Sequence, residues 1–366
     1  MLAILSVIQI HVTHEFALQN LQGLYSTVFN TLSLNTWFGM DLFFILSGYL
    51  IGSILLVSED KIASTSYFMR FYIRRIFRIF PLYYVVLTLL VLALGLSAYQ
   101  KEHVWLEYFY LSNYPTTFQN VMYWGWSLSV EEHFYLIIPF IILLLKRLPS
   151  NKSRLVTLAL LWASGFAVRW YIFSSNPDGG WGMDKYLRLL YTPTHARYDI
   201  LFAGIFIAYV QKYYAQTIKS WLGNFFINRS CAFISLFILM FIISPVKPWN
   251  KLFWEVISPG TLTGIAYVLL ILWLLNYQSL FSRFLSSRVF LKFASLGYGM
   301  FLIHIPVLRY LVLPFIKNYY IAGSGMMELY WLIALFFTFV ISVAGAYLLH
   351  IMVEKPFLYL RDKITS

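Results

Sequence analysis

The chain alternates between long apolar stretches and short polar loops. Apolar stretches of roughly 17–25 residues are long enough to cross a bilayer as helices. The sequence therefore predicts an all-α polytopic membrane protein. Its ten predicted transmembrane helices cover residues 1–18, 35–57, 80–98, 126–145, 155–174, 196–211, 230–245, 256–276, 290–313 and 328–350.

The composition agrees with this pattern. Of the 366 residues, 60% are hydrophobic and only 11% are charged, whereas soluble domains carry about twice that charged fraction. No long polar block interrupts the apolar stretches, so we expect one integral-membrane domain over residues 1–366 without an appended soluble domain. Cys231 is the single cysteine, which excludes a disulfide within the chain.

The net charge of +12 is concentrated in alternate loops. The loops of this set, together with the tail, hold 18 of the 27 basic residues: Lys61, Arg70, Arg74, Arg75, Arg78, Lys146, Arg147, Lys152, Arg154, Lys212, Lys219, Arg229, Arg283, Arg288, Lys292, Lys355, Arg361 and Lys363. Positive loops stay on the cytoplasmic side, so this pattern predicts a multi-pass protein of the cell membrane with both termini in the cytoplasm. The basic excess thus reflects topology and does not indicate nucleic-acid binding.

Two histidines are predicted near the middle of the bilayer. His11 lies roughly 16 Å into the first span at 1.5 Å per residue, and His304 lies about a dozen residues into its own span. An ionisable residue at this depth is a candidate for function. A neutral histidine bonded to a neighbouring helix is an equal alternative for His11.

A second candidate is the polar group at the start of the fourth span, where Glu131, Glu132 and His133 are consecutive. At about 100° per helical residue, Glu131 and His133 point about 200° apart and cannot serve one site. Glu131 shares its face with Ser127. We expect Glu131, Ser127 and Trp126 to form part of a pocket wall.

Three arginines precede the third predicted span. Arg78 is four residues from Arg74 and three from Arg75. On a helix these spacings place Arg78 beside both of the other arginines. Forked guanidinium groups suit phosphate recognition. An ordinary positively charged flank of the membrane span is the alternative.

Further polar residues occur near the ends of two other spans. Asp41 shares a helical face with Gly48 and Gly52, whose G-x-x-x-G spacing favours close helix contact. His195, Arg197 and Asp199 begin the sixth span. They predict either a local ion-paired cap or the wall of a polar cavity.

Seven short motifs in this order resemble the acyltransferase-3 family of integral-membrane O-acyltransferases. Each is weak alone, but their order along nearly the whole chain is specific. The motifs are Leu2–His11, Gly39–Gly48, Arg75–Arg78 with Pro81, Trp126–Glu131, Pro193–Asp199, Leu296–Pro306 and Val353–Pro356.

This resemblance implies a ten-helix enzyme of the bacterial inner membrane. Such enzymes move an acyl group, usually acetyl, from acyl-CoA to a hydroxyl of a cell-envelope glycan or lipid-linked sugar. His11 matches the essential histidine of the family, and Arg75 and Arg78 match its R-x-x-R motif, which is linked to the acyl donor. Two features depart from the family pattern: the basic residue expected eleven positions before the histidine falls before Met1, and His133 replaces the usual glutamine.

The expected mechanism uses neutral His11 as general base, because a thioester is already activated and the acceptor hydroxyl must lose a proton. Asp41, Glu131 or Asp199 would orient the imidazole, as in a triad. Direct transfer and an acyl-histidine intermediate both remain open, and no metal is expected. A transporter of a small anionic or sugar-like solute is the alternative, although paired broken half-helices are not evident.

Overall fold

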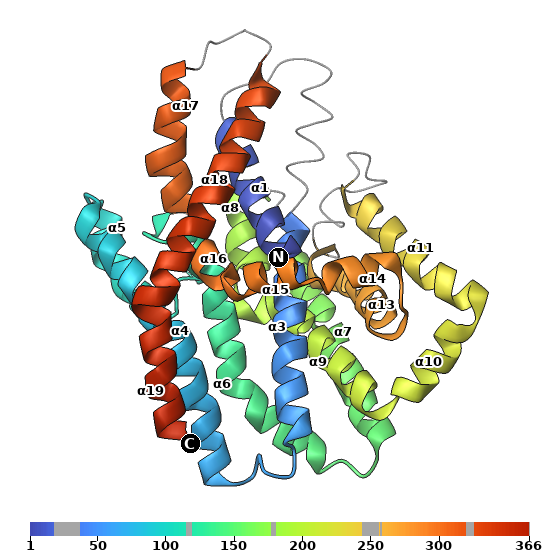
Figure 1. Ribbon diagram of the computed structural model, residues 1–366. Helices are drawn as coiled ribbons and strands as arrows, with labels where there is room; N and C mark the ends of the chain where they lie inside the picture. The colour runs from blue at the N-terminus through green and yellow to red at the C-terminus, as the bar shows by residue number, and fades with distance from the viewer. Residues whose placement is uncertain are drawn as a thin grey trace.

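The computed structural model describes residues 1–17, 37–114, 119–176, 181–243, 256, 258–319 and 326–365. Within these ranges the regular elements are helices, and no strand occurs (Figure 1). The structure therefore confirms the predicted all-α class for the described part of the chain.

The first half of the chain contains α1 (Leu2–Ala17), α3 (Phe38–Val57), α4 (Thr65–Ala93), α5 (Ala98–Tyr108), the 3₁₀ turn η3 (Tyr123–Gly125), α6 (Trp126–Lys146) and α7 (Asn151–Ser174). The second half contains α8 (Met183–Tyr186), η4 (Leu187–Tyr191), α9 (Thr194–Tyr213), α10 (Ala215–Gly223), α11 (Phe225–Ile243), η5 (Ser258–Leu262), α13 (Thr263–Asn276), α14 (Leu280–Leu285), α15 (Arg288–Ser295), α16 (Gly297–Val307), η6 (Leu308–Val312), α17 (Leu313–Tyr319), α18 (Met327–Leu349), η7 (His350–Glu354) and α19 (Lys355–Thr365).

Among the described residues, eight helical segments are long and apolar enough to cross a membrane. They correspond to eight of the ten predicted spans. The other two predicted spans coincide with α1 and α9, which are helical but are not among these eight. In Figure 1 the N-terminus lies at mid-height and the C-terminus at the lower end. The total of ten spans and the cytoplasmic location of both termini stay predictions.

Two predicted boundaries are wrong. The span predicted from residue 80 belongs to helix α4, which already begins at Thr65, where the Ser64 side chain caps it. The three arginines therefore lie inside this helix and not in a flank before it. The span expected over 290–313 is divided between α15, α16 and η6. The π-helical turn η6 follows Pro306, whose missing N–H interrupts the regular ladder.

Close packing of α3 against α9 organises one half of the molecule. A Cβ atom on Gly48 would collide with the carbonyl oxygen of Leu201, and one on Gly204 would collide with that of Ile45. Gly52 also faces α9, where Ile205 and Ala208 lie. The helix-contact role predicted for Gly48 and Gly52 is therefore confirmed.

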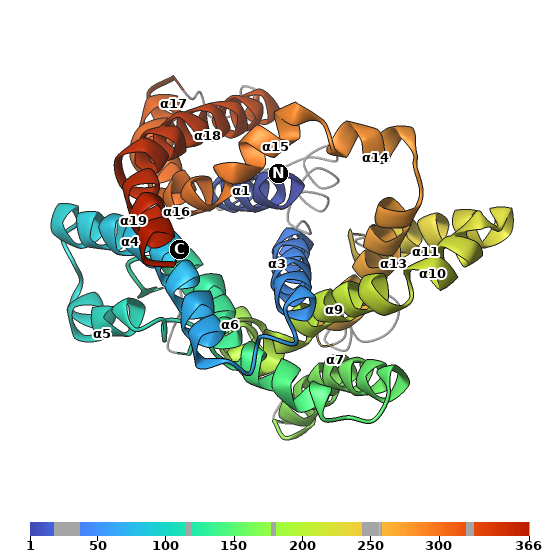
Figure 2. The same cartoon turned by 60° about the horizontal axis from the view of Figure 1, so that its bottom comes forward.

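The other half packs the first helix of the chain against helices from its last quarter. Helix α1 lies beside α16 and α18, as Figures 1 and 2 show. The indole N–H of Trp331 in α18 donates to Thr13 in α1 over 3.0 Å. Trp126 at the start of α6 packs against the apolar cores of both halves. The start of α6 is therefore one of the places where the two halves meet.

Candidate active site

Two histidines from opposite ends of the chain meet between α1 and α16. Nδ1 of His11 lies 3.0 Å from Nε2 of His304, and the two ring centroids are 5.0 Å apart. His304 is fully buried, whereas His11 is partly exposed. The sequence placed both residues at similar depth but did not predict their contact.

The hydrogen bonds determine where the protons lie on this pair. Nδ1 of His304 is 2.6 Å from the carbonyl oxygen of Phe301, which can only accept, so this nitrogen donates. In a neutral imidazole, Nε2 of His304 is then an acceptor. Nδ1 of His11 also faces the carbonyl oxygen of Val7 at 2.9 Å, and a proton on Nδ1 satisfies both neighbours.

This arrangement leaves the second nitrogen of His11 unprotonated. Nε2 of His11 has no hydrogen bond with any residue that the structure describes. A histidine whose Nδ1–H is fixed by an acceptor presents its Nε2 lone pair in a defined direction. The Nε2 lone pair is therefore free to accept a proton, as a general base requires.

Aromatic rings flank the pair. The ring of Tyr123 is 6.1 Å from that of His11, and the indole of Trp124 is 6.3 Å from the ring of His304. Arg309 lies over the outer side of Tyr123 at 4.9 Å and pairs with Glu15. The turn η3 therefore forms one wall of the histidine site.

A buried carboxylate, which the sequence did not single out, holds this turn. Both oxygens of Glu107 accept backbone N–H groups, one from Val121 and one from Met122, each over 2.7 Å. The backbone carbonyl of the same residue accepts the hydroxyl of Tyr83 over 2.8 Å. Burial raises the pKa of the Glu107 carboxyl to about 7, although the two N–H donors oppose the shift. Glu107 thus fixes the chain directly before Tyr123 and Trp124.

Glu131 is buried in α6 but belongs to a different group. Its carboxyl lies next to the hydroxyl groups of Ser47 and Tyr135 and in the electrostatic field of Arg75. The guanidinium of Arg75 is 5.4 Å above the Tyr135 ring. The hydroxyl groups of Ser47 and Tyr135 also bond each other. Glu131 therefore connects α6 with α3 and with the arginine of α4.

Asp41 and Arg197 form a fully buried ion pair between α3 and α9. The second oxygen of Asp41 accepts the hydroxyl of Thr263 and the N–H of Gly260, the latter over 3.2 Å. Gly260 has φ = +76°, a conformation that favours glycine. This left-handed residue turns the backbone N–H toward the carboxylate.

Asp199 is in a second buried ion pair, with Arg169 of α7 at 2.8 Å. Arg169 also donates to the carbonyl groups of Ala196 and Val256 and to the hydroxyl of Thr261. Gly165 lies directly against Asp199 and leaves no space for a Cβ atom. The signal for Arg169 was present in the sequence, as an arginine inside the apolar stretch 155–174.

These pairs correct two expectations. Asp41, Asp199 and Glu131 all bond to groups other than His11, and the described partners of His11 are Val7 and His304. A carboxylate–histidine triad is therefore not what the structure shows. The prediction of a local ion-paired cap over residues 195–199 is also wrong. Arg197 and Asp199 pair with residues of other helices, and His195 is exposed.

The remaining pocket residues lie near the entrance to α6. Nδ1 of His133 is 2.6 Å from the hydroxyl of Thr194, so His133 points away from Glu131 as its helical angle predicted. The rings of Tyr114 and His195 stack at 6.1 Å. The buried hydroxyl of Ser127 has no hydrogen-bond partner within the described residues.

The three arginines of α4 have different surroundings. Arg75 faces Glu131 and Glu132, while Arg74 and Arg78 are exposed. The hydroxyl of Tyr298 donates to the carbonyl of Ile79, the residue after Arg78, over 2.9 Å. The cluster therefore lies beside the start of α16.

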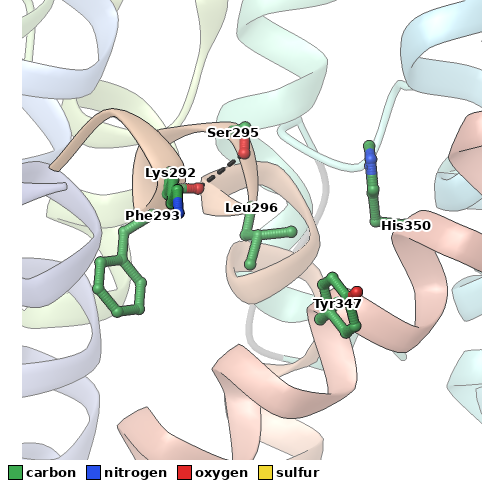
Figure 3. A pocket seen from close by; sticks show the side chains of 6 residues that line it. All are labelled: Lys292, Phe293, Ser295, Leu296, Tyr347 and His350. Carbon is green, nitrogen blue, oxygen red and sulfur yellow. Dashed lines mark hydrogen bonds between the residues drawn. The ribbon is translucent and has the colours of Figure 1, made fainter. Parts of the chain in front are cut away.

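A cavity of about 550 Å³ lies between α15, α18 and η7, with Leu296, the residue before α16, in its lining (Figure 3). The side chains drawn there are Lys292, Phe293, Ser295, Leu296, Tyr347 and His350. Nδ1 of His350 bonds Glu354 over 2.6 Å. The cavity combines one exposed cation with two aromatic rings and is of the size that small ligands occupy. Among the residues with described positions, no three His, Cys, Asp or Glu side chains form a metal-binding group.

Comparisons with known proteins identify the family of the chain. A family model described as "Acyltransferase domain" matches residues 1–351. The chain is similar to the O-acetyltransferase OatA of Staphylococcus aureus (strain NCTC 8325 / PS 47), with 29% identity over 314 residues. The alignment covers 80% of this chain and 48% of that protein.

A putative O-acetyltransferase of S. aureus (strain COL) is 25% identical over 351 residues, which are 87% of this chain and 52% of that protein. The chain thus spans about half the length of these curated relatives. No solved structure gives a significant match.

Proposed function

Because the chain belongs to the acyltransferase-3 family, we propose that it transfers an acetyl group from acetyl-CoA to a hydroxyl of a cell-envelope glycan or lipid-linked sugar. Family membership and the apolar helices support an O-acetyltransferase of the bacterial cell membrane. They also favour group transfer over the transport function that the sequence left open. The observation that carries the proposed chemistry is the His11–His304 contact.

In this proposal Nε2 of His11 is the general base. It accepts the proton of the acceptor hydroxyl while the hydroxyl oxygen attacks the thioester carbonyl carbon. The C–S bond then breaks, the ester forms, and the same proton passes from Nε2 to the departing CoA sulfur. His304 takes no proton in these steps, because its Nδ1–H is already bonded to Phe301.

His304 replaces the carboxylate of a conventional triad as the group that orients the base. A neutral acceptor at 3.0 Å holds the Nδ1–H tautomer of His11 without placing a negative charge in an apolar environment. An imidazole is a weaker orienting partner for a developing imidazolium than a carboxylate is. The activated thioester lowers the demand on the base, which makes this pairing chemically adequate.

For the donor, we assign the phosphate groups of CoA to Arg74, Arg75 and Arg78. The exposed position of Arg74 and Arg78 supports this role, because free guanidinium groups can form forked contacts with phosphate. Arg75 interacts electrostatically with Glu131 and Glu132 and would serve as the link between the donor region and α6. The cavity that includes Leu296, two residues before Tyr298, is also lined by Lys292, whose ammonium adds positive charge.

The base is tested with purified protein in detergent, acetyl-CoA and an envelope glycan fraction as acceptor. We expect His11→Ala to lower the rate of acetyl-ester formation by about 10²–10⁴-fold, the usual contribution of a general base. His14→Ala is the matched control, since His14 is exposed on the same helix. Full transfer by a normally expressed His11→Ala protein would refute this mechanism.

The donor assignment is tested separately by thermal unfolding. Acetyl-CoA should raise the unfolding temperature of the wild-type protein, because a ligand that binds only the folded state stabilises it. Arg78→Ala should remove this increase, whereas Arg361→Ala, in α19, should keep it. An equal increase in the wild type and Arg78→Ala would show that the phosphates bind elsewhere.

A further inference from the structure

Four partly exposed aromatic side chains gather at the entrance to α6 and α9. The Tyr191 ring is their centre: its centroid is 5.0 Å from Trp126, 5.9 Å from Tyr186 and 6.2 Å from Trp37. Tyr191 ends the π-helical turn η4, and Trp37 directly precedes α3. We call these four residues the aromatic platform. Three of them lie outside the set that the sequence predicted.

A buried cation lies against the platform. The guanidinium carbon of Arg197 is 4.9 Å from the Tyr191 ring centroid, and its Nη2 is the atom that pairs with Asp41. Nε and Nη1 of Arg197 have no hydrogen-bond partner in the described part of the chain, and both atoms are buried. Unpaired donors on a buried cation cost free energy, so a ligand oxygen or water that reaches them is favoured.

The surroundings of the platform are polar. Asp184 and Arg188 are exposed and pair with each other at 2.8 Å, one turn before Tyr191. The Lys185 ammonium lies 5.0 Å from the Trp181 ring. Charged side chains are costly against lipid chains, so this group favours a position at an aqueous or interfacial surface.

The platform is also close to the histidine site along the chain. Tyr123 contacts His11, and Trp126 belongs to the platform, so three residue steps join the two places. Three residues span at most about 11 Å. The platform and the histidine site therefore share the short segment 123–126, which supplies Tyr123 to one and Trp126 to the other.

We propose that the aromatic platform is the acceptor subsite and that it takes a pyranose ring. This inference rests on the proposed function and specifies its acceptor side. The apolar C–H face of a sugar ring complements the negative face of aromatic rings. The sugar hydroxyl oxygens at the ring edge supply acceptors for Arg197. A lipid chain would satisfy the rings but not the arginine.

The test measures binding without acetyl-CoA, so that it does not depend on transfer. Purified protein in detergent is titrated with chitotriose, maltotriose and a hyaluronan hexasaccharide, and the dissociation constants are measured by calorimetry. We expect the wild-type protein to bind at least one of the three. Trp37→Ala and Tyr186→Ala should weaken that binding about tenfold each, the loss of roughly one ring contact.

Control variants distinguish a loss of sugar binding from a loss of acetyl transfer. Tyr191→Phe keeps the ring and should bind as the wild type does, and Tyr171→Ala changes an exposed ring on α7 outside the platform. His11→Ala should retain sugar binding, so loss of transfer with intact binding concerns the base alone. The subsite is overturned if the wild type binds none of the saccharides, or if Trp37→Ala and Tyr186→Ala bind them unchanged.

Discussion

The carboxylate of Asp41 in α3 is paired with the guanidinium of Arg197 in α9, and neither side chain has any exposed surface. Asp41 further accepts from Thr263 and Gly260, so one carboxylate connects three separate parts of the chain. A buried pair of this kind is costly to break, because the remaining partner keeps an uncompensated charge. Its position suits a structural role next to the platform.

We therefore expect Asp41→Asn to destabilise the protein by about 3–5 kcal/mol, the usual cost of removing one partner of a buried pair. The thermal unfolding midpoint in detergent measures this effect. Asp60→Asn is the control, since Asp60 pairs with Lys146 in solvent and such pairs often contribute nothing measurable. A stable Asp41→Asn protein without activity would instead assign Asp41 to the chemistry.

His304→Ala should lower kcat about 10²-fold while the KM for acetyl-CoA stays constant, because His304 orients the base and does not touch the donor. His304→Gln should recover part of the rate, since its side-chain carbonyl can accept the Nδ1–H of His11. Steady-state kinetics of both variants provide the measurement. Equal rates for the alanine and glutamine variants would indicate a packing role alone.

The Glu107 carboxyl should make the free energy of unfolding depend on pH. Its pKa is about 7 in the folded protein and 4.5 ordinarily, so the folded state binds the proton more tightly. The free energy of unfolding that this group contributes thus falls by about 3 kcal/mol at most as the pH rises from 4.5 to 7. Glu107→Gln does not titrate and should lose that decrease.

Unfolding midpoints of the wild type and Glu107→Gln at pH 5 and pH 7 test this expectation. The midpoint of the variant relative to the wild type should rise between the two pH values. Parallel changes in both proteins would show that Glu107 titrates normally. Acetyl transfer by the variant should also fall at both pH values, because an amide has one acceptor oxygen for the two N–H groups that position Tyr123.

Gly48→Ala should destabilise the contact between α3 and α9 by about 1–3 kcal/mol, as extra methyl groups do in packed interiors. The added Cβ meets the Leu201 backbone, which cannot move without shifting the helix. Gly95→Ala is the matched control, since no atom lies within 4 Å of its Cβ position. Equal unfolding midpoints for the two variants would contradict the close packing.

Local sequence signals singled out several residues that the structure brings together at the candidate site. His11 and His304 stood out because ionisable groups are expensive inside apolar stretches. The divergence of Glu131 and His133 followed from helical angles alone, and the separate partners of the two side chains agree with it. Gly48 and Gly52 were recognised because their spacing places both on one helical face.

Other features could not be read from the chain. Glu107 gives no local signal, because its role depends on the backbone of residues 121 and 122 folding back over it. The platform combines Trp37, Trp126, Tyr186 and Tyr191 from three separated segments. Aromatic residues make up 20% of this chain, so no individual ring is distinctive.

The sequence by itself determined the helical membrane class and the family, since these depend on hydrophobic length and on the order of short motifs. Only the tertiary structure decided which polar groups meet. His11 and His304 are 293 positions apart, and Asp41 and Arg197 are 156 apart. Helix packing selects such partners by the shape of whole faces, with glycines such as Gly48 setting the distance, and no short motif contains that information.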